Sequence, residues 1–147
     1  MNSEASLWDV LRPLLQPYGR VDRVENALGE GMPDVNYCLR WRGNSAAQEG
    51  WVELKWANDT RLDARFLNQH KMSTGQINWH AHSGGRSHLI TGRGACVFVH
   101  TAVYQASGCT LDLANYWTVK QAIEKAALYL DVKARNFPRD LLYVLTR

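Results

Sequence analysis

Three charged residues, Asp34, Glu53 and Lys55, occupy polar positions in two stretches where apolar and polar residues alternate. Alternation with period two, as in residues 51–56 (WVELKW) and 35–41, predicts β-strands. Glu53 and Lys55 therefore point to the same face of one strand, about 7 Å apart along the chain. If the two strands pair as a hairpin, both carboxylates converge beside the ammonium. That set suits a hard divalent cation and a water molecule to be activated.

The segments around these strands predict the elements that hold them. Ser3 caps a helix with apolar positions from Leu7 to Leu15, and Pro13 predicts a break or kink in it. Residues 20–28 fit a helix or a strand. A strand over 35–42 then leads through a polar hairpin loop at 43–50 into the strand that carries Glu53.

The second half of the chain predicts an irregular stretch over 57–72 and then further helices and strands. Ser73 and Gln76 form a capping-box pattern for a helix that ends at Gly84. Strands follow at 87–91 and 95–103. Thr118 and Gln121 repeat the capping pattern before a helical stripe that runs to Leu130, and 141–145 is a last strand or short helix. This order predicts an α/β fold with a mixed β-sheet flanked by helices.

The composition bounds the class of protein. A chain of 147 residues with 46% hydrophobic residues fits a single domain, 1–147. No apolar run approaches the roughly 20 residues of a membrane span, and no secretory signal is recognisable. Three widely spaced cysteines indicate free thiols in a reducing compartment, so we expect a cytoplasmic protein. The net charge of +3 permits a polyanionic partner without demonstrating one.

The series VEN at 24–26, GMPDVN at 31–36 and WVELK at 51–55, followed by Gln76, Trp79 and the Gly-Gly-Arg at 84–86, resembles the PD-(D/E)XK nuclease superfamily. It is most similar to small stand-alone VRR-NUC and Holliday-junction-resolvase-like members, including phage-encoded ones. The resemblance covers residues 20 to 100. It implies a restriction-endonuclease-like αβββαβ core and a Mg²⁺-dependent DNA endonuclease, with Mn²⁺ as a substitute. For a phage-encoded protein, the compartment is the host cytoplasm.

The resemblance also implies roles for individual residues. Asp34, Glu53 and the main-chain carbonyl of Leu54 bind the metal, and Lys55 orients or helps to deprotonate the attacking water. Glu25 is the upstream acidic residue of the site, and Glu30 is the alternative. Gln76 points at the site from the helix that it caps.

Each of these residues also has a plain structural alternative. Asp34 suits a turn after proline, and Glu53 with Lys55 suits a solvated strand pair that contributes little to stability. Gln76 suits the N3 half of a capping box with no further role.

The basic residues Arg61, Arg65, Lys71 and Arg86 are the candidate phosphate contacts, which position DNA without reading its sequence. We expect a preference for branched or junction DNA, and a homodimer, since symmetric cutting of two strands needs two sites. The alternatives are an exonuclease or a site-specific nuclease on the same scaffold, and a catalytically silent DNA-binding subunit.

Overall fold

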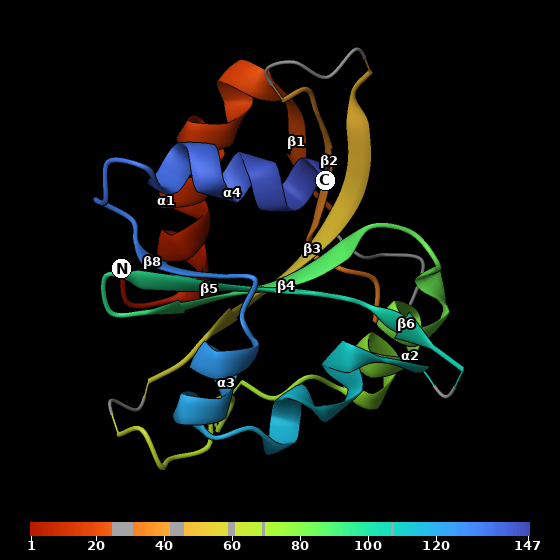
Figure 1. Ribbon diagram of the computed structural model, residues 1–147, viewed down its shortest axis with the longest axis vertical. Helices are drawn as coiled ribbons and strands as arrows, with labels where there is room; N and C mark the ends of the chain where they lie inside the picture. The colour runs from red at the N-terminus through yellow and green to blue at the C-terminus, as the bar shows by residue number, and fades with distance from the viewer. Residues whose placement is uncertain (25–30, 42–45, 59–60, 69, 107) are drawn as a thin grey trace.

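The computed structural model describes residues 1–24, 31–41, 46–58, 61–68, 70–106 and 108–147. Within these residues, one six-stranded mixed sheet has the order β1-β2-β3-β4-β5-β8 (Figure 1). Its strands are β1 (Gly19–Arg23), β2 (Val35–Leu39), β3 (Gln48–Trp56), β4 (Ser87–Arg93), β5 (Cys96–Thr101) and β8 (Leu128–Asp131). The β3–β4 pair is parallel and the other pairs are antiparallel. The predicted α/β class and mixed sheet are confirmed.

Helices cover both faces of this sheet (Figure 1). Helices α1 (Glu4–Leu15) and α4 (Phe137–Thr146) lie on one face, and α2 (Thr74–Ser83), the 3₁₀-helix η2 (Thr110–Tyr116) and α3 (Val119–Lys125) lie on the other. Helix α2 provides the crossover that a parallel β3–β4 pair needs. The order α1-β1-β2-β3-α2-β4 is the expected αβββαβ order. The remaining short elements are η1 (Gln16–Tyr18) and the hairpin of β6 (Tyr104–Gln105) with β7 (Gly108–Cys109).

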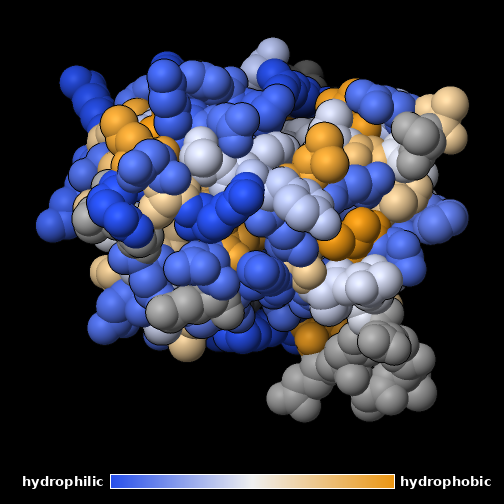
Figure 2. All heavy atoms as spheres, turned by 90° about the horizontal axis from the view of Figure 1, so that it is seen from below, coloured by the Kyte–Doolittle hydropathy of each residue, from blue (hydrophilic) through white to orange (hydrophobic). Residues whose placement is uncertain are grey.

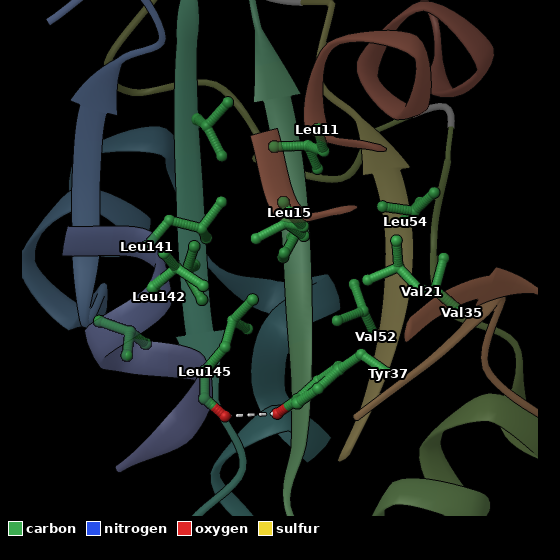
Figure 3. Packing of buried hydrophobic residues seen from close by; sticks show 14 of the residues in the cluster. Leu11, Leu15, Val21, Val35, Tyr37, Val52, Leu54, Leu141, Leu142 and Leu145 are labelled. Carbon is green, nitrogen blue, oxygen red and sulfur yellow. Dashed lines mark hydrogen bonds between the residues drawn. The ribbon is translucent and has the colours of Figure 1, made fainter. Parts of the chain in front are cut away.

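The core under α1 and α4 fixes one face of the sheet (Figure 3). Leucines of the two helices pack on apolar residues of β1, β2 and β3, including Val52 and Leu54. The buried hydroxyl of Tyr37 donates a hydrogen bond to the Leu145 carbonyl at 2.7 Å, and Nε2 of His88 lies 3.0 Å from the Tyr37 hydroxyl oxygen. This polar contact ties α4 to the strand that follows Asp34.

A second core covers the opposite face, and it determines the surroundings of the candidate site. Phe66, Phe98 and Trp117 are buried there, in a cluster with residues of η2 and α3. Strand β3 is consequently buried on both faces. Glu53 is only 2% exposed and Lys55 is 8% exposed, so the interpretation of these two residues as a solvated pair on a half-buried strand is wrong.

The last third of the chain departs from the predicted helix over 119–130. Helix α3 ends at Lys125, Ala126 is extended, and the chain continues as β8. The apolar spacing fits a helix, but the backbone of β5 gains a hydrogen-bonded partner when residues 128–131 form an edge strand. By sequence, two segments fit either a helix or a strand. Of 20–28, residues 20–23 belong to strand β1 and residues 25–28 lie outside the described residues, and 141–145 belongs to helix α4.

Elsewhere the local signals agree with the structure in part. Capping boxes occur at Ser3, Ser73 and Thr118, whereas helix α1 continues through Pro13 without a break. Strand β2 ends at Leu39, short of the expected residue 42. Of the loop predicted at 43–50, residues 43–45 lie outside the described residues, and residues 48–50 belong instead to β3, where they pair with β2. The described residues of 57–72 are irregular, as expected. No helix among the described residues is long and apolar enough to cross a membrane.

Candidate active site

The pairing of β2 with β3 brings the two predicted carboxylates together. Val35 pairs with Val52 in antiparallel register, so the preceding residue, Asp34, lies opposite Glu53. The main-chain N–H of Leu54 donates a hydrogen bond to Oδ2 of Asp34 at 2.9 Å. The Asp34 carboxylate, just before the first residue of β2, therefore accepts the hydrogen bond that a main-chain carbonyl would accept if the strand pairing continued.

Burial and close approach give Glu53 an unusual electrostatic environment. Burial, and after it the negative charge of Asp34, raise the pKa of the Glu53 carboxyl to about 9, while the Lys55 ammonium acts in the opposite direction. No hydrogen-bond donor among the described residues reaches its buried Oε2. If both were ionised, the facing carboxylates of Asp34 and Glu53 would repel each other. The pair therefore needs either a shared proton or a cation.

Lys55 is held beside this pair by a main-chain carbonyl. Its Nζ lies 3.7 Å from Oε1 of Glu53 and donates a hydrogen bond to the carbonyl of Lys71 at 3.2 Å. The next residue, Met72, exchanges two hydrogen bonds with the side chain of Asn115, at 2.7 and 2.8 Å. Residue 115 in η2 thus fixes the segment that positions the ammonium, a contact that the sequence did not reveal.

Gln76 has both of the roles that the sequence suggested for it. Its Oε1 accepts a hydrogen bond from the main-chain N–H of Ser73, which completes the capping box. Its Nε2 donates to Oε1 of Glu53 at 2.7 Å. Helix α2 comes this close because Gly31, at φ +84°, lies against Gly75 and Gln76, where a Cβ would be only 2.1 Å from the Gly75 carbonyl oxygen.

The two roles of Gln76 are separable by mutation. We expect Ser73→Ala to lower the free energy of unfolding by about 1 kcal/mol through loss of the cap, with Mg²⁺ affinity unchanged at a temperature where both proteins are folded. Gln76→Ala keeps the Ser73 cap on the main-chain N–H of residue 76. It removes the reciprocal hydrogen bond from the Ser73 N–H and the contact with Glu53, so we expect a smaller loss of stability and, in addition, weaker Mg²⁺ binding. Urea unfolding and a Mg²⁺ titration measure the two effects, and equal Mg²⁺ affinity in both variants would contradict the second role.

The donor set fits a hard divalent cation. The two carboxyl groups offer oxygens, one of them without a donor, and oxygen ligands select Mg²⁺ or Mn²⁺. The N–H and C=O of one strand residue point to the same neighbour, so the Leu54 carbonyl lies on the Asp34 side of β3. The part of the chain that the structure describes contains no cluster of three or more His, Cys, Asp or Glu residues arranged to hold a metal.

The predicted upstream acid, Glu25, and its alternative, Glu30, lie outside the described residues. The structure instead points to a residue that sequence reasoning missed. The negative charge of Glu4, in the first turn of α1, also raises the pKa of Glu53, and Oε1 of Glu4 lies 3.9 Å from Nδ1 of His70. No local sequence signal marks Glu4, because its proximity to β3 arises only when α1 packs on the sheet.

The four predicted phosphate contacts do not form one group. Arg61, Arg65 and Lys71 are exposed along the stretch that ends at the Lys55 contact. Arg86 instead donates hydrogen bonds to the carbonyls of Glu49 and Arg147, near the start of β3. Arg86 therefore lies at the opposite end of β3 from Lys55. Its two hydrogen bonds connect the start of β3 to the C-terminal residue that follows α4.

Comparisons with protein families, with curated proteins and with solved structures found no match for this chain.

Proposed function

We propose that this chain is a Mg²⁺-dependent DNA endonuclease of the PD-(D/E)XK type. The observation that carries the proposal is the arrangement of Asp34, Glu53 and Lys55: two facing carboxyl groups, one of them almost fully buried, beside a buried ammonium. Burying charges is costly unless they are paired, and the apolar cores on both faces of the sheet do not depend on these groups. A function in binding a cation accounts for them.

The side chains divide the chemistry among them. Asp34, Glu53 and the Leu54 carbonyl would hold Mg²⁺, which neutralises charge on a phosphodiester and lowers the pKa of a bound water. Lys55, fixed by the Lys71 carbonyl, places a positive charge where negative charge develops during hydrolysis. Gln76 keeps the Glu53 carboxylate oriented, because its Nε2 donates a hydrogen bond to Oε1 of Glu53.

The proposal keeps the finer expectations drawn from the sequence: branched or junction DNA as substrate, a homodimer, and a cytoplasmic location. These concern the surface around the site and the assembly, which the arrangement of the three residues leaves open. Light scattering of the purified protein would measure the assembly directly.

A cleavage panel tests the activity. We expect the wild type, with Mg²⁺, to cut a four-way junction faster than linear duplex, and to nick a covalently closed circle, which offers no ends to an exonuclease. Asp34→Ala should abolish cutting, since it removes a metal-binding carboxylate. The matched control is Asp22→Ala, because Asp22 is an exposed carboxylate on the neighbouring strand, paired with Arg20; its activity should equal that of the wild type.

The alternatives give different results in the same panel. An exonuclease would degrade linear DNA and leave the closed circle intact. A silent subunit would bind junctions with an affinity unaffected by Mg²⁺ or by Asp34→Ala, and would cut nothing. If Asp34→Ala cuts as well as the wild type, the proposed site is wrong.

A further inference from the structure

A ribbon of two chain segments, 61–66 and 116–120, forms part of the surface beside η2 and α3. Three main-chain hydrogen bonds join them: Phe66 N–H to the Trp117 carbonyl, Val119 N–H to that of Ala64, and Lys120 N–H to that of Leu62, each at 2.9 Å. The Arg65 guanidinium also donates to the Tyr116 carbonyl. This stretch of the irregular segment is therefore bound to the last third of the chain by regular backbone contacts.

The two faces of this ribbon differ in chemistry. Phe66, Trp117 and Val119 belong to the second core, and Ala64 is buried as well. The outer side carries two kinds of exposed residue, namely the cations Arg61, Arg65 and Lys120 and the apolar or aromatic Leu62 and Tyr116. Asp63 is the one acidic residue of the two segments. Figure 2, which views the molecule from this side, shows apolar patches set among hydrophilic ones.

Tyr116 is the most informative residue of this surface. The residue is 66% exposed, although its backbone is held on both sides. Asn115 before it is hydrogen-bonded to Met72, and after it the Tyr116 carbonyl accepts from Arg65 and Trp117 is buried. An exposed aromatic ring on a fixed backbone offers a stacking platform at little cost in conformational entropy. Cations spaced around such a ring are the arrangement by which proteins bind single-stranded nucleic acid, where every base has a face to stack.

We propose that this ribbon binds a single-stranded segment of DNA, with an unpaired base stacked on Tyr116 and the phosphates near Arg65 and Lys120. The inference rests on the proposed function only in that the bound strand is then part of a DNA that the protein cuts. The ribbon is connected to the candidate active site, because Asn115, next to Tyr116, holds Met72, and the adjacent Lys71 carbonyl holds the Lys55 ammonium. Branched DNA supplies unpaired bases beside a duplex. Binding of such a base to this surface would therefore explain a preference for branched DNA over linear duplex.

Binding of a labelled oligothymidine of about 12 nucleotides, measured by fluorescence anisotropy in EDTA, tests the inference without cleavage. We expect Tyr116→Leu to raise Kd roughly 5- to 100-fold, as for loss of one stacked base, and Tyr116→Phe to bind like the wild type. Lys120→Gln should lower the slope of log K against log salt by about 0.7. Tyr143, 53% exposed on α4 on the other side of the sheet, is the matched control: Tyr143→Leu should leave Kd unchanged.

Three outcomes would overturn the inference. The first is that the wild type does not bind the oligothymidine, the second that Tyr116→Leu binds it with the same Kd as the wild type, and the third that Tyr143→Leu loses as much affinity as Tyr116→Leu. Its failure is distinct from failure of the proposed nuclease activity. If the wild type cuts junctions but Tyr116→Leu binds and cuts normally, the surface is wrong and the nuclease stands. If the wild type cuts nothing while binding depends on Tyr116, the surface stands alone.

Discussion

Replacing Lys55 with methionine should lower the rate of DNA cleavage by roughly 10²- to 10³-fold at saturating DNA, the range for loss of one electrostatic contact to a transition state. The Lys55 ammonium is buried, 3.7 Å from Oε1 of Glu53, and hydrogen-bonded to the Lys71 carbonyl. Methionine keeps much of the length and the apolar stem of the side chain, so the packing of β3 should survive. The loss should therefore appear in the rate, measured by single-turnover cleavage with Mg²⁺.

The neighbouring Lys71 provides the control for this prediction. Lys71→Ala removes an exposed ammonium but keeps the main-chain carbonyl that holds Lys55. We expect it to weaken DNA binding, more so at low salt, while the saturated rate stays near that of the wild type. If Lys71→Ala reduces the saturated rate as much as Lys55→Met does, the effect is one of general surface charge, and the special role of Lys55 is wrong.

The sequence predicted the geometry of the candidate site because that geometry depends on short-range patterns. Alternation placed Asp34 and Glu53 on paired strands, and antiparallel pairing of neighbours in the chain then sets them opposite each other. The capping box of Ser73 and Gln76 fixed the start of the helix that reaches Glu53. Each of these signals lies within a few residues of the feature that it predicts.

The features that escaped prediction depend on contacts between distant parts of the chain. Burial of the polar face of β3 requires η2 and α3, which follow more than fifty residues later in the sequence. The proximity of Glu4 to Glu53 requires α1 to pack across the sheet, and the hold of Asn115 on Met72 joins segments with no shared pattern. Residues 128–131 form a strand because the edge of β5 is open to pairing, a tertiary reason that overrides helical spacing.

These distant contacts also explain how the protein tolerates its charged site. The strands and the apolar cores hold Glu53 against Asp34, so burial and, after it, the repulsion by Asp34 raise the pKa of Glu53. A group that is neutral in the folded state and ionised in the unfolded state makes folding depend on pH. The candidate site should therefore be detectable in stability measurements as well as in cleavage.

Metal-free protein should lose stability as the pH rises from 7 to 8.5, and Glu53→Gln should remove most of that loss. A small part should remain, because burial also raises the pKa of the Cys109 thiol. The pKa of Glu53 is about 9 in the folded protein against 4.5 in the unfolded chain. Between these values the unfolded chain has lost the proton that the folded protein keeps, so unfolding becomes easier by up to about 1.4 kcal/mol per pH unit. The buried His80, His88 and His100 act in the opposite direction only below pH 6.5, where the unfolded chain takes up protons.

Mg²⁺ should reverse this dependence in the wild type, because it binds the ionised carboxylate and so stabilises the folded protein more at pH 8.5 than at pH 7. Urea unfolding in EDTA and in Mg²⁺, at both pH values, measures the two effects. Glu49→Gln is the matched control, since Glu49 lies on the same strand with an exposed side chain, and it should behave like the wild type. Glu53→Gln, without a titrating group, should be more stable than metal-free wild type at pH 8.5 and gain little from Mg²⁺. A wild type whose stability is the same at both pH values, with no response to Mg²⁺, would mean that Glu53 is not held in the proposed environment.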